Sequence, residues 1–497
     1  MKIVLINPNT GGRNRLMLPV PPYGLVSLAA VAMQGGHDVE VWDQFAYRQS
    51  HETLADMLIE HKVDLVGITC LTPAEPASRR IFDLYRLRGG KGLTLMGGVH
   101  STVFHKKLVE QGVCDLVVRR EGEGVFAELL SCLEAGRPLH DIKGITFKDK
   151  GIVVSTEDHE LISNLNTLPV PAWEAITGGI DVYSQAPTLG LYGRTLPILG
   201  SRGCPKRCTF CGQEIFHKGM RFRSIDSILS EIETLHQRFA IKNFVFLDAN
   251  FPISHKYGMQ FCEAMIESGL HKKMGWSTEL TVNIVNRELL LMMAKAGCRN
   301  IEYGFETGSQ KLLDESKKGT TIEQGLEASR WTREAGIHTF GLFLIGLPGE
   351  TPRDSFATLR LAMKLDCNVV KFNIVIPYPG CELFEKHRET LLENFDPESY
   401  NSWFQSSDPY RKVTVMPGGM SPNTLLFIQR IMLLIYYVRP RIVLKHLRNK
   451  TLRPRDYLDG ARFLIGGMAQ ALWKITRSAL GFGTAPDGAK DKETVAS

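Results

Sequence analysis

Three closely spaced cysteines constrain this chain more than any other feature. Cys204, Cys208 and Cys211 follow a C-x3-C-x2-C spacing, directly after an apolar segment, 196–200, that is typical of a strand. Three thiolates within eight residues can bind one face of a metal centre. Because a cubic iron–sulfur cluster usually takes four cysteines, three would leave one iron open to an exchangeable ligand.

Two other interpretations of these cysteines are open at this point. A structural zinc site usually has four ligands, and the nearest fourth candidate is His217, which is followed by the basic Lys218. A disulfide cluster requires an oxidising compartment and cannot pair three cysteines among themselves. The spacing therefore favours an iron–sulfur cluster over zinc and over disulfides.

Length and composition are those of a multidomain globular protein. The chain has 497 residues, of which 43% are hydrophobic and 23% charged, which predicts two to four domains. The N-terminus begins with a strand-like segment rather than a secretory signal, and no apolar run reaches the roughly 18–20 residues that span a bilayer. We expect a cytoplasmic protein, with peripheral contact at the inner membrane surface as an open alternative.

Residues 1–145 alternate between strand-like and helix-like segments. This alternation predicts a doubly wound, Rossmann-like α/β domain, in which ligands bind beyond the carboxyl ends of the strands. The expected strands are 2–7, 39–43, 63–69, 93–96 and 116–119. No G-x-G-x-x-G follows the first strand and no P-loop motif occurs, so the sequence disfavours a dinucleotide or nucleoside triphosphate site.

Residues 191–400 repeat the alternation after a proline-containing connector, 146–190, whose Trp173 is expected to pack at the joint. Six strands separated by helices predict a partial (β/α)6 barrel with the cysteines at its mouth. The expected strands are 196–200, 243–248, 275–278, 300–304, 339–345 and 369–374.

Residues 401–482 are predicted to form a helical C-terminal domain, and 483–497 a disordered tail. The apolar segment 425–438 contains Arg430 and precedes seven lysines and arginines between 439 and 455 with no acidic residue among them. Such a segment could contact an anionic membrane surface or a hydrophobic substrate. Alternatively, it could form a helical cap that packs its apolar face on the barrel, and we favour this interpretation. A second helix is expected over 457–480. The chain lacks a basic groove interleaved with aromatic residues, so no nucleic acid partner is predicted.

The cysteine run, with Phe210 before its third cysteine, resembles the signature of the radical S-adenosylmethionine (SAM) superfamily. There the open iron of a [4Fe-4S] cluster binds the amino and carboxylate groups of SAM, and reduction yields a 5'-deoxyadenosyl radical. The segments 304–309, 341–350 and 375–380 resemble the supporting motifs of that superfamily. The resemblance implies that Cys204, Cys208 and Cys211 are the catalytic, metal-binding residues, and that SAM contacts Phe210, Gly304, Glu306, Gly346 and Pro377.

The first domain resembles the cobalamin-binding domain of the cobalamin-dependent radical SAM family, through the segments 21–24, 97–100 and 120–124. This resemblance implies a cobalamin site formed by Asn7, Tyr23, Gly24, Thr69, Thr72, Gly97, Gly98, His100, Glu121, Gly122 and Glu123. The D-x-H-x-x-G motif that supplies a histidine to cobalt in methionine-synthase-like domains is absent, since Asp43 is followed by Gln44 and Phe45. We therefore expect His100 to line the pocket of the nucleotide tail rather than to bind cobalt.

The family resemblance implies a radical SAM enzyme of the methylase or anaerobic cyclase type. We predict C-methylation of a hydrophobic, lipid- or hopanoid-like substrate, because the C-terminal part is apolar and basic. Oxidative ring closure of the anaerobic magnesium-protoporphyrin monomethyl ester cyclase type is one alternative, and a non-catalytic corrinoid- or zinc-binding regulatory protein is another. The reaction implies a flavodoxin- or ferredoxin-like electron donor, whose docking Lys206 and Arg207 would favour.

Asp248 and Asn250 lie at the end of the second expected barrel strand and face the same mouth. We expect them either to position SAM or substrate, or to form an Asx-type turn.

Overall fold

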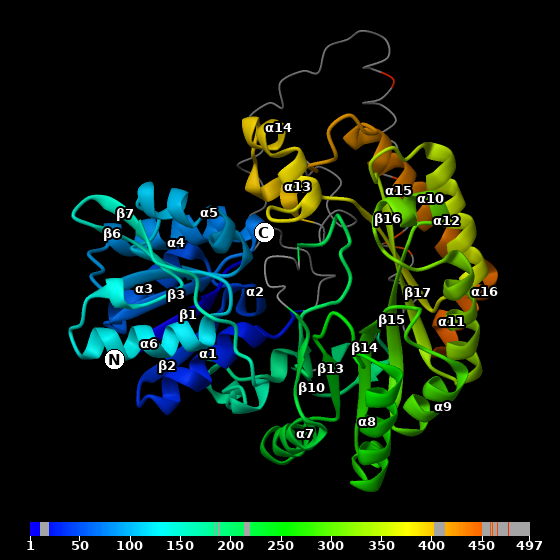
Figure 1. The fold of residues 1–497 in the computed structure, drawn as a ribbon, viewed down its shortest axis with the longest axis horizontal. Coiled ribbons are helices and arrows are strands. Elements are labelled where there is room, and N and C mark those ends of the chain that lie inside the picture. The colour runs from blue at the N-terminus through cyan, green and yellow to red at the C-terminus, as the bar shows by residue number, and fades with distance from the viewer. Residues whose placement is uncertain are drawn as a thin grey trace.

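Two sheets, each covered by helices, organise the chain (Figure 1). The computed structural model describes residues 1–9, 19–183, 185–186, 189–212, 219–401 and 413–449, and the single positions 458, 460, 465 and 476. The first sheet, blue to cyan in Figure 1, has seven strands, and the second, green to yellow, has six. The predicted His217 ligand, nearly all of the second C-terminal helix and the tail lie outside the described residues.

The first sheet has the order β2-β1-β3-β4-β5-β6-β7. Its strands are β1 (Lys2–Asn7), β2 (Asp38–Asp43), β3 (Leu65–Thr69), β4 (Leu93–Gly97), β5 (Leu116–Val118), β6 (Ile145–Asp149) and β7 (Ile152–Ser155). The first five are parallel, which confirms the doubly wound fold. The strand order reverses between β1 and β3, where such sheets bind their ligands.

Helices cover both faces of this sheet. They are α1 (Tyr23–Gln34), α2 (Gln44–Tyr47), α3 (His51–Glu60), α4 (Glu75–Leu87), α5 (Val99–Glu110) and α6 (Gly122–Glu134). Alternate residues of β1 enter different cores: Ile3 and Leu5 pack with α1 and α6, whereas Val4 and Ile6 pack with α3, α4 and α5. Burial on both faces explains why β1 is apolar throughout.

The hairpin β6–β7 joins the first sheet, antiparallel to β5. A hairpin-like pair around Gly144 and Gly151 is expected from the sequence, but as part of the connector that begins at residue 146, because a short hairpin shows no strand–helix alternation. In the connector, Trp173 is buried and packs edge-on against Tyr23 of α1, with ring centroids 6.2 Å apart. The expectation that Trp173 packs at the joint is confirmed.

The second sheet is parallel, and its strands follow in chain order. They are β10 (Thr195–Ile198), β13 (Asn243–Phe246), β14 (Gly275–Leu280), β15 (Cys298–Glu306), β16 (His338–Ile345) and β17 (Val369–Ile374). The covering helices are α7 (Ile225–Phe239), α8 (His255–Glu267), α9 (Arg287–Lys295), α10 (Gln310–Glu315), α11 (Ile322–Glu334) and α12 (Pro352–Leu365). The predicted partial (β/α)6 barrel is confirmed, since β10 and β17 end the strand order instead of pairing with each other.

The barrel strands alternate between a helix-facing side and an inner side. Tyr303 donates to or accepts from Thr332 of α11 (3.0 Å), so odd-numbered residues of β15 face the helices. Along β16 every second residue from His338 to Leu344 keeps accessible surface, while those between are buried. Phe340 and Leu342 are among the inner residues, and both are therefore partly accessible.

The segment after β17 contacts the barrel and helix α5 of the first domain. It contains α13 (Glu382–Lys386), α14 (Arg388–Glu393), α15 (Pro422–Tyr437) and α16 (Pro440–Asn449). Tyr436 of α15 donates to the carbonyl of Cys367 (2.7 Å), and Gln429 donates to that of Phe372 (2.7 Å). The apolar segment 425–438 thus packs on the barrel, as favoured from the sequence. In the described parts of the chain, no helix combines the length and apolarity needed to cross a membrane.

Candidate active site

The cysteine loop leaves the barrel directly after β10. Its two ends pair as a short antiparallel ribbon, β11 (Ser201–Arg202) with β12 (Arg221–Phe222). Gly203 has φ +97°, and a Cβ atom there would lie 2.6 Å from the Gly219 carbonyl oxygen, so the base of the loop requires glycine. The three cysteines are partly exposed, whereas the other seven are buried. Only the loop cysteines thus combine proximity in the sequence with access to an incoming metal centre.

Neighbouring elements hold the cysteine loop in place. The Thr209 amide donates to the carbonyl of Ser316 (3.0 Å), and its carbonyl accepts from the amide of Leu383 (3.0 Å). Across the described residues, no three His, Cys, Asp or Glu side chains are close enough to bind a single ion.

The Cys208 thiol lies beside a buried ion pair. Lys318 donates to Glu306 with 2.5 Å between Nζ and Oε1. Burial raises the pKa of Cys208 to about 11, while the Lys318 ammonium acts in the opposite direction. Burial alone would lower the pKa of Lys318, but Glu306 and the nearby thiols raise it above its usual value. Lys318 is therefore charged and supports a thiolate at Cys208.

Gly304 makes room for this pair. A Cβ atom at Gly304 would meet Glu306 Oε1 at 2.4 Å and Lys318 Nζ at 2.7 Å. The predicted residues Gly304 and Glu306 thus lie together, and the structure adds Lys318. The sequence carries no signal that separates Lys318 from Lys317, which instead pairs with Glu382 at the surface.

The other predicted SAM residues have different surroundings. Gly346 has φ +85°, and its amide donates to Glu350 (2.7 Å), which closes the turn after β16. Phe210 is partly buried against the core that contains α13. Pro377 follows β17 and is buried. SAM contacts at these three positions stay predictions.

A cavity of about 310 Å³ lies between the carboxyl-terminal edges of the two sheets. Seven of the residues predicted for cobalamin line it: Gly24, Thr69, Gly97, Gly98, Glu121, Gly122 and Glu123. The barrel contributes Leu199, Ser201, Arg202, Gly203, Arg221, Leu247, Asp248 and Ala249. One cavity therefore reaches from the switch point of the first sheet to the base of the cysteine loop.

At Gly98, in the wall of this cavity, the backbone lies close to the backbone of Cys70. The φ of Gly98 is +97°, and an added Cβ would lie 3.0 Å from the Cys70 carbonyl oxygen. No other residue fits here without strain, which leaves the wall open to a flat, bulky ligand.

Two arginine–glutamate pairs join the first domain to the cysteine loop. Arg202 contacts Glu123 and Arg221 contacts Glu121, each at 2.5 Å. Burial raises the pKa of Glu123, but the Arg202 guanidinium outweighs burial and brings that pKa below its usual value. The N-terminus of α6 and the ribbon β11–β12 are thus linked by charged, largely buried pairs. These four residues form what we call the interdomain clamp.

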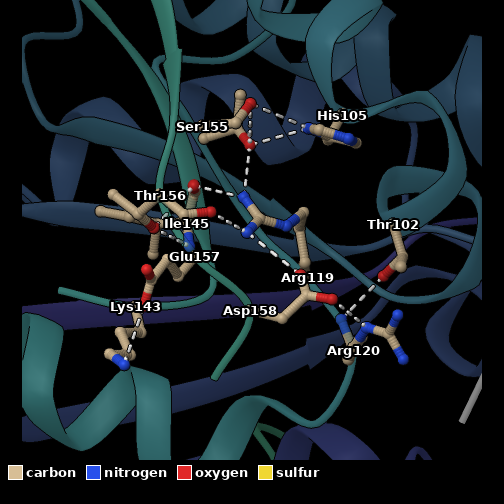
Figure 2. A network of polar contacts seen from close by, with 11 residues as sticks. Thr102, His105, Arg119, Arg120, Lys143, Ile145, Ser155, Thr156, Glu157 and Asp158 are labelled. Atoms are coloured by element: carbon tan, nitrogen blue, oxygen red, sulfur yellow. Dashed lines mark hydrogen bonds and ion pairs between the residues drawn. The ribbon is translucent and has the colours of Figure 1, made fainter. Parts of the chain in front are cut away.

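The preceding residues anchor the start of α6 to the hairpin. Figure 2 shows the Arg119 guanidinium reaching the Thr156 carbonyl (2.5 Å) and Asp158 (3.2 Å). Arg120, which lines the cavity, has φ +61° and contacts Asp158 through Nε (3.0 Å). The residues that follow β7 therefore fix the start of α6, where Glu121 and Glu123 lie.

Four residues predicted for cobalamin, Asn7, Tyr23, Thr72 and His100, do not line this cavity. His100 is 3% exposed and packs between Phe104 (4.7 Å between centroids) and Phe395 (6.4 Å), with Thr72 Oγ1 3.4 Å from its Nδ1. His100 lines a separate pocket with Phe104 of α5 and Phe395 of the segment after β17, so its place in the pocket of the nucleotide tail stays a prediction. Asn7 donates to Asp43 (3.0 Å), and Tyr23 packs on Trp173.

The turn after β13 supports the cysteine loop. Asp248 accepts from the Gly200 amide (2.9 Å) and the Ser201 hydroxyl (2.5 Å), and burial raises its pKa to about 7. Asn250 donates to Cys204 Sγ (3.4 Å). Both residues hold the cysteine loop in place. A contact with SAM or substrate, expected as one alternative from the sequence, stays a prediction.

Comparison with known proteins gives two family matches. A model described as the radical SAM superfamily matches residues 198–362, and one described as the B12 binding domain matches 13–130. An uncharacterized methyltransferase of Pyrococcus horikoshii is 29% identical over 90% of this chain and 95% of its own length. The anaerobic magnesium-protoporphyrin IX monomethyl ester cyclase of Cereibacter sphaeroides is 31% identical over 81% of this chain and 66% of its own length.

Solved structures share the fold. The radical SAM methyltransferase TsrM from Kitasatospora setae, with cobalamin and a [4Fe-4S] cluster bound, has a TM-score of 0.66 at 21% identity, covering 88% of this chain and 89% of TsrM. The cobalamin-dependent SAM radical enzyme OxsB has a TM-score of 0.65 at 16% identity, covering 98% of this chain and 82% of OxsB.

Fold, site and family matches define a radical SAM enzyme with an N-terminal B12-binding domain. The chain belongs to the cobalamin-dependent radical SAM family, whose cofactors are a [4Fe-4S] cluster, SAM and cobalamin. The residues present fit these groups: three partly exposed thiols for the cluster, and a glycine-walled cavity beside them for cobalamin.

Proposed function

We propose that this enzyme transfers a methyl group from SAM, by way of cobalamin, to an unactivated carbon of a mainly hydrophobic substrate. When bound, the cluster and SAM supply hydrogen-abstracting chemistry and cobalamin supplies the methyl group. The observation that carries the proposal is the shared cavity, because glycines of the first domain and the base of the cysteine loop line the same space. Cobalamin held there would face the loop directly.

Relatives named as methyltransferases support this reaction. Besides the Pyrococcus protein, they include the bacteriochlorophyllide d C-12(1)-methyltransferase of Chlorobaculum tepidum, 25% identical over 70% of this chain, and the hopanoid C-3 methylase of Methylococcus capsulatus, 24% identical over 79%. The last of these fits the predicted hydrophobic substrate.

The chain's own residues have distinct tasks in this proposal. Cys204, Cys208 and Cys211 hold the cluster. Glu306 and Lys318 present a carboxylate and an ammonium side by side, which are complementary to the ammonium and carboxylate of SAM. The interdomain clamp keeps the cavity wall against the cysteine loop.

The inner face of the barrel supports an acceptor with an apolar body. Phe340, Leu342 and Leu344 keep accessible surface there. Glu302 lies on the same side of β15 and opposite Phe340 in the strand register. A site that is mostly apolar with a few polar groups is typical for an organic substrate.

Oxidative cyclisation is the second candidate reaction. Anaerobic magnesium-protoporphyrin IX monomethyl ester cyclases from three organisms are 25–31% identical to this chain. Both reactions use the same three cofactors, so the site geometry supports either, and the fate of the methyl group of SAM distinguishes them.

We also propose an acidic, flavodoxin- or ferredoxin-like electron donor, supported by the partly exposed Lys206 and the exposed Arg207 in the cysteine loop. Peripheral contact of α16 with an anionic membrane is a further proposal, supported by Leu444, which is 66% exposed, and the neighbouring Arg441.

The test is an anaerobic incubation of the reconstituted enzyme with cobalamin, a reductant and SAM labelled in its methyl group. The acceptors are a hopanoid lipid, a magnesium porphyrin monomethyl ester and a small-molecule extract. Label in a product, together with 5'-deoxyadenosine, is the expected result. An unlabelled, oxidised product with 5'-deoxyadenosine would establish cyclisation instead, and Cys208→Ala serves as the inactive control.

A further inference from the structure

Asn250 lies between the barrel and the first cysteine of the loop. It follows β13 and is 4% exposed. Its Oδ1 accepts two hydrogen bonds from Thr281, one from the amide (2.7 Å) and one from the hydroxyl. Its Nδ2 donates to Cys204 Sγ at 3.4 Å.

The Thr281 amide determines which way the Asn250 side chain points. A backbone N–H can only donate, so the group that faces it must be the oxygen of the Asn250 amide. The NH2 group is then on the opposite side, toward the sulfur. The orientation thus follows from the hydrogen-bond network around Asn250 rather than from the shape of the side chain.

A hydrogen bond to a cluster ligand affects the reduction potential of the cluster. Reduction adds negative charge that is partly carried by the sulfur ligands, so an N–H donor stabilises the reduced form more than the oxidised form. Because Asn250 is buried, water does not readily replace its N–H when the side chain is removed.

We propose that Asn250 is a positioning residue for the cluster, which orients Cys204 through its side-chain N–H and raises the reduction potential of the cluster. The inference concerns electron entry and is independent of whether the enzyme methylates or cyclises its substrate. It also separates Asn250 from Asp248, which holds the base of the loop through Gly200 and Ser201 but donates nothing to a cysteine.

The experiment is a redox titration of the reconstituted cluster without SAM, followed by electron paramagnetic resonance. At a fixed solution potential we expect Asn250→Ala to lower the ratio of reduced to oxidised cluster roughly tenfold. For a one-electron couple this corresponds to a reduction potential lower by about 59 mV. The matched control is Asn243→Ala, which removes a buried amide from the other end of the same barrel strand, where Asn243 donates to the Tyr192 carbonyl (2.8 Å). Its cluster should titrate as the wild type does.

Iron content and thermal midpoint are measured alongside. A purely structural role for Asn250 predicts fewer clusters per chain with an unchanged potential, and that result would overturn the proposal. If Asn250→Ala does not assemble a cluster, Thr281→Ala provides the measurement, because it removes the hydroxyl that fixes the amide and should shift the potential in the same direction by less. A wild-type potential in Thr281→Ala would then count against the proposal.

Discussion

Lys318 and Glu306 form a buried ion pair beside Cys208. Removing Lys318 leaves the buried Glu306 carboxylate without its partner. It also removes the cation that would pair with the carboxylate of SAM. We predict that Lys318→Met weakens SAM binding at least tenfold, measured by the change that SAM causes in the spectrum of the reduced cluster. Lys317→Met is the matched control, because Lys317 pairs with Glu382 at the surface. Equal affinities in the two variants would contradict this role of Lys318.

Gly98 allows a backbone approach that no other residue permits. Gly98→Ala would place a Cβ 3.0 Å from the Cys70 carbonyl in a left-handed conformation, at a cost of about 1–3 kcal/mol. We predict less bound cobalamin after gel filtration and a lower thermal midpoint. Gly112→Ala has a similar φ, +67°, with open space around it, so it should lose stability but keep cobalamin. Loss of cobalamin in both variants would show that backbone strain alone explains the effect.

Motifs with fixed spacing and the ends of expected strands led to the cysteines, Glu306 and the seven residues that line the cavity, whose cofactor contacts stay predictions. Lys318 could not be predicted, because Lys317 and Lys318 are adjacent and only the folded backbone determines which of them points toward Glu306. The neighbours of His100 could not be predicted for a related reason: Phe395, whose ring packs near that of His100, comes almost 300 residues later in the chain. Contacts between distant segments leave no local pattern.

At the scale of elements, the interdomain clamp joins α6 to the ribbon β11–β12. Arg202→Met leaves Glu123 buried and unpaired, which costs on the order of 3 kcal/mol. We predict a thermal midpoint lower by several degrees and faster loss of cobalamin. In the double variant Arg202→Met with Glu123→Gln no charge is left unpaired, so part of the stability should return.

The control for the clamp is Arg287→Met, which removes an exposed pair with Glu334 and should change stability little. If Arg202→Met melted with the wild type and retained cobalamin equally, the clamp would have no role in joining the domains.

Helix α5 carries a pH-sensitive contact with the segment after β17. Burial lowers the pKa of His100 to about 3, whereas an unfolded histidine titrates near 6.5. The unfolded chain therefore binds the proton first, and folding stability decreases as pH falls from about 6.5 toward 3. We predict that the thermal midpoint of the apoprotein falls less steeply over this window in His100→Gln than in the wild type. Parallel pH profiles would contradict the assignment.

Element boundaries show where local patterns end. Strand–helix alternation predicted all five parallel strands of the first sheet and all six of the barrel. It assigned β6 and β7 to the connector, although the antiparallel pairing of β6 with β5 places them in the first sheet. Arg119 donates to the carbonyls of Ile145 in β6 and of Thr156 just after β7, and such contacts depend on the fold and not on a residue pattern.

At the scale of the whole molecule, two α/β units place their strand ends around one cavity. The residues that line it come from the strands, from the loops that follow them and from helices α1 and α6, at the edge of the sheet where this fold class binds ligands. The order of the domains and the class of each followed from the sequence. Their mutual arrangement did not, because the clamp pairs Glu121 and Glu123 with arginines about 80–100 residues away.

The most direct test of the central claim is the amount of 5'-deoxyadenosine that the anaerobically reconstituted enzyme forms from SAM, measured together with iron and sulfide. The wild type should hold about four irons and four sulfides per chain and release the nucleoside, while Cys208→Ala should lose both. Nucleoside release that persists in Cys208→Ala, or a wild type that binds zinc and releases none, would contradict the account.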